Sequence, residues 1–97
     1  MVKGYLLGQI TISDKSQYKI CDSKIEKVIE EFGGKNLVKG GLRIVKEGNP
    51  SFQRDVLVEF KDVKTAQRFF SSQQFKEISK FRKAGSNGVL LLLNGKE

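Results

Sequence analysis

The sequence predicts an α+β domain in which helices cover one face of a four-stranded antiparallel sheet. Three observations support this prediction. Segments that alternate between apolar and polar residues are separated by segments with helical spacing. Glycine pairs and polar turns divide these segments, and their order is β-α-β-β-α-β. The 97 residues, of which 38% are hydrophobic, suit one small folded unit, so we assign residues 1–97 to a single domain.

The first strand and helix follow from periodicity. Residues 5–13 alternate, with one side formed by Leu6, Ile10 and Ile12, and the other by Tyr5, Leu7, Gln9 and Thr11. Asp14 followed by Gln17 is a capping-box pattern that begins a helix. The apolar stripe of this helix consists of Tyr18, Cys21, Ile25, Val28, Ile29 and Phe32. Gly33-Gly34 ends it, with Gly33 as the left-handed cap.

The middle of the chain predicts two further strands. Residues 35–38 form the second strand, and the glycines at 40 and 41 predict a bend or bulge. Residues 42–47 are expected to continue as a strand or short extension, and residues 48–51 as a turn. Residues 55–60 form the third strand, with Val56, Val58 and Phe60 on one face and Asp55, Leu57 and Glu59 on the other.

The last third of the chain predicts two helical segments and a strand. Asp62 caps a helix with core residues Ala66, Phe69 and Phe70, and Ser72 caps another that carries Phe75, Ile78 and Phe81. Residues 85–88 predict a turn, and residues 89–93 a last, wholly apolar strand. The order of elements is that of the ferredoxin-like plan, in which right-handed crossovers place the helices on one face of the sheet.

The other face of the predicted sheet carries no helix. Tyr5, Leu7, Leu57 and one side of residues 89–93 would lie on it. Because a monomer rarely leaves so large an apolar face in water, we expect a second copy, a nucleic acid or a ligand to cover it. We favour a homodimer formed through the sheet face.

Composition excludes several kinds of chemistry. The chain has no histidine, which excludes a Ser–His–Asp triad and histidine-ligated metal or haem. Cys21 is the only cysteine, so we expect a buried structural thiol, with no internal disulfide and no thiolate cluster. No secretory signal is visible, and the longest apolar run, residues 89–93, is far too short for a membrane span. We therefore expect a cytoplasmic protein without a metal, cofactor or membrane partner.

The net charge of +7 allows two interpretations. A basic face can bind nucleic acid, and RNA-recognition domains share this order of elements. Fourteen of the eighteen basic residues are lysine, however, which is typical of a solvated surface. Where an RNA-recognition domain stacks bases on aromatic side chains, this chain has Asp55 and Leu57, and only Tyr5 is aromatic. We therefore expect no nucleic-acid partner, and RNA binding is the less favoured alternative.

Glu59 and Arg54 are the most informative polar residues. Glu59 lies mid-strand on the helix-free face, where a covered carboxylate needs a partner, and Arg54, Lys39 and Gln9 are the candidates. Glu59 is either a general base or substrate anchor, or one half of a structural ion pair. Arg54 either holds an anionic substrate group or forms a salt bridge in the loop.

An ordered set of short motifs resembles a known family. The set consists of Gly4-Tyr5, Asp14 with Tyr18, Gly33-Gly34-Lys35, Val38-Lys39-Gly40-Gly41, Arg54 ahead of residues 56–60, and Phe69-Phe70-Ser71-Ser72 with Phe75. Over residues 3–93 the sequence resembles the bacterial domain of unknown function thirteen-thirty family. The resemblance implies a dimeric α+β barrel, a homodimer whose two sheets enclose a cavity, and it implies a cavity role for Tyr18. The family often has Trp-Tyr in place of Phe69-Phe70, Tyr in place of Phe75, and Arg in place of Lys39.

Two functional hypotheses of different classes follow. The first is a cofactor-free monooxygenase- or isomerase-like enzyme, classes that the wider barrel group contains, acting on a small organic acid or aromatic compound in the cavity between the sheets. Its polar centre would be Glu59 and Arg54, with Glu59 as the candidate catalytic residue. Its expected substrate-binding residues are Glu59, Arg54, Lys39, Gln9 and Tyr18. The second hypothesis is a non-enzymatic ligand-binding accessory dimer.

Overall fold

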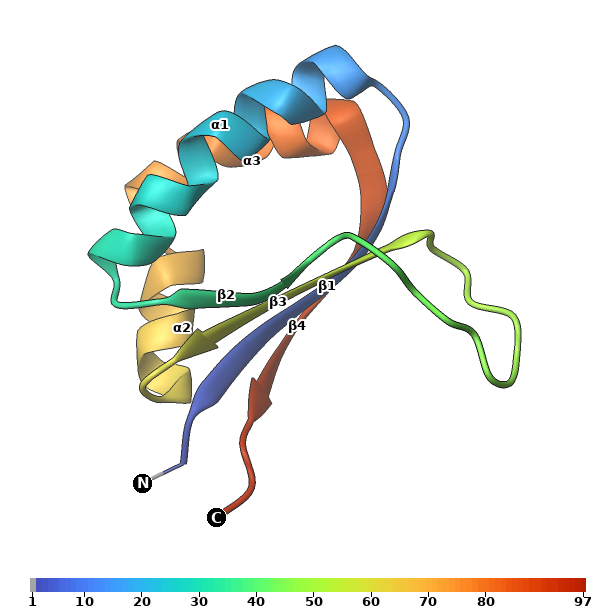
Figure 1. Cartoon of the computed structure of the whole chain (residues 1–97). Helices are drawn as coiled ribbons and strands as arrows, with labels where there is room; N and C mark the ends of the chain where they lie inside the picture. The colour runs from blue at the N-terminus through green and yellow to red at the C-terminus, as the bar shows by residue number, and fades with distance from the viewer. Residues whose placement is uncertain (1) are drawn as a thin grey trace.

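The computed structural model describes residues 2–97 and arranges them as one sheet with its helices on a single face (Figure 1). The strands are β1 (Gly4–Ile12), β2 (Lys35–Lys39), β3 (Arg54–Phe60) and β4 (Ser86–Asn94). The helices are α1 (Lys15–Glu31), α2 (Val63–Phe70) and α3 (Gln73–Gly85). The strand order is β2-β3-β1-β4, and every neighbouring pair is antiparallel. The predicted ferredoxin-like α+β fold is confirmed.

The core lies between the helices and the sheet, as the alternation predicted. Leu6 of β1 pairs with Val58 of β3 and Leu92 of β4, and all three point to the helices. Phe69 of α2 is fully buried, and its ring lies 5.3 Å from that of Phe60 and 4.9 Å from that of Phe75. These close aromatic contacts fasten α2 and α3 to the sheet.

The predicted helix caps are confirmed. The Asp14 carboxylate accepts hydrogen bonds from the backbone amides of Ser16 and Gln17, at 3.0 and 3.2 Å. The Asp62 carboxylate accepts from the Thr65 amide at 2.8 Å, and the Ser72 hydroxyl accepts from the Phe75 amide at 3.1 Å. Each cap pairs an amide that the first helical turn leaves free, which is why these helices begin where they do.

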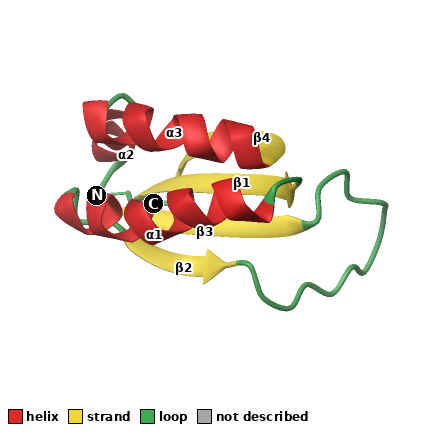
Figure 2. Ribbon diagram, turned by 90° about the horizontal axis from the view of Figure 1, so that it is seen from above, coloured by secondary structure: helices red, strands yellow, loops and turns green. Residues whose placement is uncertain are grey.

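The expectation of a strand or extension over residues 42–47 is wrong. After β2 the backbone of Gly40 and Gly41 has φ of 69° and 83°, and these left-handed conformations turn the chain away from the sheet. Residues 40–53, which we call the arm, extend beyond the body of the domain without regular structure (Figure 2). Leu42 and Ile44 on the arm are 90% and 68% exposed.

The expectation of a turn over residues 85–88 is also wrong. Helix α3 continues to Gly85, and β4 begins at the next residue. The Gly85 carbonyl accepts hydrogen bonds from the amides of Ser13 and Asp14, at 2.9 and 3.2 Å, which binds the end of α3 to the start of α1. Gly88 is a strand residue, and a Cβ there would collide with the Gln9 carbonyl of β1. The glycine serves close strand pairing, not a turn.

A bulge in β2 decides which side chains face the helices. Lys35 pairs with Glu59, but the register shifts between Asn36 and Val38, so that Lys39 pairs with Val56. Val56 lies on the helix side of β3, and Lys39 therefore lies there too. Without the extra residue the two lysines, four positions apart, would share a face.

The helices of residues 2–97 include none that is long and apolar enough to cross a membrane.

Candidate functional site

A cavity of about 70 Å³ lies between the helices and the sheet, and we call it the helix-side cavity. This volume is several times the roughly 10–15 Å³ that one water molecule needs. Its interior is apolar, because β1, β3 and β4 turn alternate residues toward it and α1 adds its buried stripe. The apolar lining includes Leu6, Ile25, Ile29, Val58, Phe69 and Leu90.

Polar side chains gather at one end of this cavity. Tyr18 and Asp22 come from α1, where they lie one turn apart, Lys39 comes from the end of β2, and Arg82 comes from α3. Arg54, the first residue of β3, lies against Tyr18, with its guanidinium carbon 5.8 Å from the centre of the ring. We call these five residues the polar end.

Lys39 joins β2 to α1 at the side of the cavity. Its ammonium nitrogen lies 2.8 Å from a carboxylate oxygen of Glu26 and 3.4 Å from one of Asp22. Asn36 donates a second hydrogen bond to Glu26, at 3.0 Å. The hydrogen bond to Glu26, more than any other contact, raises the pKa of Lys39. Lys39 is therefore a paired cation, and both nearby carboxylates are engaged with it.

Arg54 has no such partner among the described residues. Its Nε is fully buried and makes no hydrogen bond, and no carboxylate oxygen lies within salt-bridge distance of its guanidinium. Gly40 provides the space for this group, since a Cβ at that position would lie 2.7 Å from the Arg54 guanidinium carbon. A cation–π contact with Tyr18 is the interaction that holds it.

Arg82 also has no carboxylate partner among the described residues. Among residues 2–97 its Nε is buried without a hydrogen bond, and its terminal nitrogen donates only to the neutral Ser79 hydroxyl, at 3.3 Å. The guanidinium lies 5.5 Å from the centre of the Phe75 ring. Burial lowers the pKa of Arg82, which is the expected effect of desolvating an unpaired cation.

Tyr18 and Cys21 are held neutral beside these two arginines. Burial raises the pKa of Tyr18, and the nearby Arg54 charge only partly opposes it. Burial likewise raises the pKa of the Cys21 thiol against the influence of Arg82. Cys21 is 4% exposed, which confirms the predicted buried thiol, and it lines the cavity.

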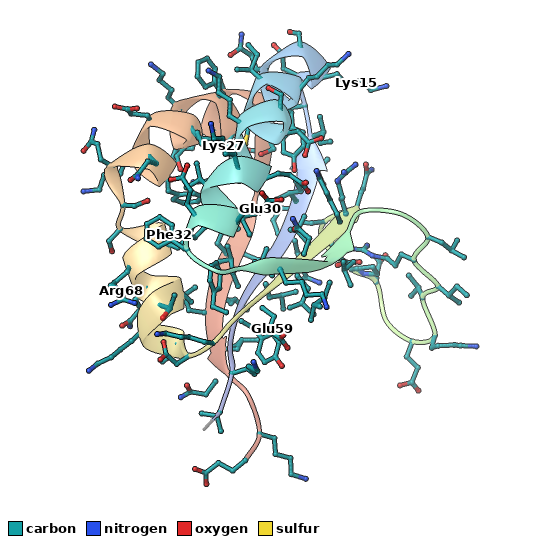
Figure 3. The ribbon with its side chains drawn as sticks, turned by 60° about the vertical axis from the view of Figure 1, so that its left-hand side comes forward. Lys15, Lys27, Glu30, Phe32, Glu59 and Arg68 are labelled. Carbon is teal, nitrogen blue, oxygen red and sulfur yellow. The ribbon has the colours of Figure 1, made fainter. Side chains whose placement is uncertain are left out.

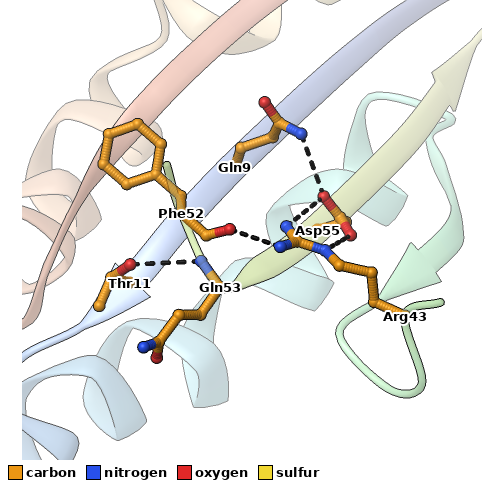
Figure 4. A network of polar contacts seen from close by, with 6 residues as sticks. All are labelled: Gln9, Thr11, Arg43, Phe52, Gln53 and Asp55. Carbon is orange, nitrogen blue, oxygen red and sulfur yellow. Dashed lines mark hydrogen bonds and ion pairs between the residues drawn. The ribbon is translucent and has the colours of Figure 1, made fainter. Parts of the chain in front are cut away.

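The opposite, helix-free face of the sheet, which we call the open face, carries a second group of polar contacts. The Tyr5 hydroxyl donates to Glu59 at 3.1 Å, which raises the pKa of Tyr5. Arg43 of the arm donates twice to the Asp55 carboxylate, at 2.7 and 2.9 Å, and also to the Phe52 carbonyl (Figure 4). Gln9 donates to the same Asp55 carboxylate at 3.3 Å. This network attaches the base of the arm to β3.

The expected polar centre of Glu59 and Arg54 is wrong, because these residues lie on opposite faces of the sheet. They are five positions apart on one strand, and an odd separation turns side chains to opposite sides. Glu59 projects on the side away from the labelled α1 residues Lys27 and Glu30 (Figure 3). Its partner is Tyr5, and not Arg54, Lys39 or Gln9.

The structure therefore divides the predicted site residues. Arg54, Lys39 and Tyr18 meet at the polar end, whereas Glu59 and Gln9 lie on the open face. Sequence reasoning missed Arg82 and Asp22. A signal for Arg82 was present, since Phe75, Ile78 and Arg82 follow helical spacing on the buried side of α3. The expected cavity between two sheets needs a second copy and stays a prediction.

Comparison with known proteins supports the fold more than a reaction. The model of the family described as Domain of unknown function (DUF1330) matches residues 3–96. No curated protein matches the chain.

Solved structures of this fold include a protein of unknown function and a hypothetical protein. A protein of unknown function from Rhodopseudomonas palustris is 16% identical, with a TM-score of 0.80 over 99% of this chain and 84% of that one. A hypothetical Arabidopsis thaliana protein is 10% identical, with a TM-score of 0.63 over 99% of this chain and 87% of that one.

A third similar structure has a stated activity. SnoaB, a cofactor-independent oxygenase from Streptomyces nogalater, is 11% identical, with a TM-score of 0.56 over 100% of this chain and 96% of that one. Identity this low shows a common fold and nothing more.

Proposed function

The chain belongs to the DUF1330 family, and we propose that it binds a small organic molecule in the helix-side cavity and transforms it as a cofactor-free oxygenase- or isomerase-like enzyme. The observation that carries this proposal is the division of the cavity into an apolar interior and one polar end. Ligand sites commonly combine an apolar wall with a few convergent polar groups, which fix the orientation of the ligand.

The chemistry of the polar end is compatible with such a reaction. Without a cofactor, the substrate itself must lose a proton and become an electron-rich anion. Positive groups already in place, such as Arg54 and Arg82, stabilise negative charge as it develops, and they act strongly where water is excluded. Asp22 and Tyr18 are the groups in the cavity that could accept or donate the proton.

The fold of SnoaB supports the oxygenase class, because that protein is a cofactor-independent oxygenase with the same architecture. Glu59 has no part in this reaction in our proposal, since it lies across the sheet from the cavity. We assign it instead to the open face.

We also propose that two cytoplasmic copies pack through their open faces. Val89, Leu91 and Leu93 of β4 are 41–47% exposed there. Covering them would remove apolar area from water, and a standard interface of about 1,200–2,000 Å² in total would suffice.

The cavity can be tested by filling it. Ile25→Phe adds volume at the lining, whereas Ile20→Phe makes the same change on α1 outside it. In NMR titrations with small hydroxyaromatic compounds, we expect wild type and Ile20→Phe to show shifts at cavity residues and Ile25→Phe to show none. Shifts that persist in Ile25→Phe would place the ligand elsewhere and refute the proposed site.

Turnover decides between the enzyme and a non-enzymatic binding protein. With compounds that bind, we expect oxygen uptake or isomerisation that is lost in Ile25→Phe. Saturable binding without any conversion of the bound compounds would favour the non-enzymatic alternative.

A further inference from the structure

We propose that the ligand of the helix-side cavity is an organic monoanion whose charged group is held between Arg54 and Arg82. This inference rests on the proposed function, because it names the ligand class of the same cavity. It also adds Arg82, on α3, as a specificity-determining residue.

Positive charges outnumber negative charges around this end of the cavity. The polar end holds three cations, Lys39, Arg54 and Arg82, and one carboxylate, Asp22, and Lys39 also binds Glu26 beside the cavity. Both carboxylates are engaged by Lys39, at 3.4 and 2.8 Å. One positive charge is left in excess, and a single negative charge on the ligand would balance it.

The guanidinium groups of Arg54 and Arg82 have no carboxylate partner among the described residues. Each has an Nε atom buried without a hydrogen-bond partner. Both side chains are half-buried, and buried donors without a partner are rare. Arg43 shows the contrast within this chain, because its Nε and one terminal nitrogen both donate to the Asp55 carboxylate. A carboxylate between Arg54 and Arg82 would receive the same kind of charge-assisted hydrogen bonds.

Both guanidinium groups lie next to the apolar interior of the cavity. Arg54 covers the Tyr18 ring from β3, and Arg82 from α3 lines the cavity itself, with its guanidinium carbon 5.5 Å from the centre of the Phe75 ring. Tyr18 and Cys21 both line the cavity. An anion at this point would direct its apolar remainder inward, toward Ile25 and Leu90.

The unpaired arginines and the apolar lining together define the ligand class. It is a compact molecule with one negative charge at neutral pH, preferably a planar carboxylate, and a short apolar body. Inorganic phosphate would satisfy the guanidinium groups but leave the apolar lining without contact, so it serves as the probe for an anion site of another kind.

The test uses matched probes on the intact protein. Benzoate and benzamide have the same shape and differ in charge, and inorganic phosphate has charge without an apolar body. In NMR titrations at neutral pH, we expect benzoate to shift the signals of cavity residues. Its affinity should be at least about tenfold higher than that of benzamide. Phosphate should neither bind comparably nor displace benzoate.

Variants assign this preference to the two arginines. Arg54→Gln and Arg82→Gln should each abolish most of the preference for benzoate, whereas Arg68→Gln, an exposed change on α2, should retain it. Arg82→Lys keeps the charge but loses the planar fork, so it should retain part of the preference even if Arg82→Gln does not fold.

The outcomes separate the two proposals. Equal affinity for benzoate and benzamide, or a preference that both arginine variants retain, would overturn the monoanion inference and leave the cavity proposal standing. Phosphate binding that matches benzoate would overturn the organic part of the inference. Absence of cavity shifts with both ring compounds would count against both proposals.

Discussion

Gly40→Ala should displace Arg54 with little more effect on stability than the same change at Gly41. Both glycines have positive φ, 69° and 83°, so each substitution incurs the left-handed penalty of about 1–2 kcal/mol. At Gly41 the new methyl group meets no atom within 4 Å. At Gly40 it would lie 2.7 Å from the Arg54 guanidinium carbon and 3.0 Å from its Nε. Because the guanidinium is the end of a flexible side chain, we expect it to move.

Two measurements separate strain from displacement. In thermal unfolding, both variants should lose a similar amount, about 4–8 °C for each kcal/mol in a domain of this size. In benzoate titrations, affinity should fall about tenfold in Gly40→Ala and stay near the wild-type value in Gly41→Ala. If affinity falls equally in both variants, or in neither, the position of Arg54 does not control the site and the reasoning fails.

Four further predictions concern the core, the arm and the open face. Phe69→Ala should reduce the free energy of unfolding by about 3–5 kcal/mol in denaturant titrations, because the ring is fully buried; a loss below about 1 kcal/mol would contradict the packing. Hydrogen bonds from Arg43 hold the pKa of Asp55 below its usual 3.8, so the stability from this pair is present above that pH and is lost as pH falls through the lowered pKa. Asp55→Asn should flatten this acid limb of the stability curve, and an unchanged limb would assign it to other carboxylates. Leu91→Glu should convert the dimer into a folded monomer, as measured by light scattering, and a persisting dimer would place the interface elsewhere. Glu59→Gln should leave benzoate affinity unchanged, and a marked loss would return Glu59 to the site.

Much of the fold could be predicted from local sequence patterns. Asp14, Asp62 and Ser72 cap the helices as predicted, because a cap needs only a side-chain oxygen and an amide two or three residues away. Val58 and Phe60 are buried as their alternation predicted. Had the predicted strand begun one residue earlier, at Arg54, the same alternation would have placed Arg54 and Glu59 on opposite faces of the sheet.

The polar end required contacts between distant segments. Arg54 and Arg82 come from β3 and α3, and no local pattern states that both remain without a carboxylate. The bulge in β2 moves Lys39 to the helix side, and the placement of a bulge depends on how β3 pairs with it. The arm leaves the sheet because Gly40 and Gly41 turn it outward, although residues 42–47 are apolar enough for a strand.

The sequence by itself determined the order of the helices and strands, the caps and most of the buried faces, because backbone geometry repeats every 2 or 3.6 residues and neighbouring residues reveal it. Tertiary structure decided that the cavity lies under the helices, that Arg82 lines it, and that Arg54 lies beside it over the Tyr18 ring. The reason is physical: a site of this kind depends on which charges are already paired, and that depends on side chains brought together from four separate elements.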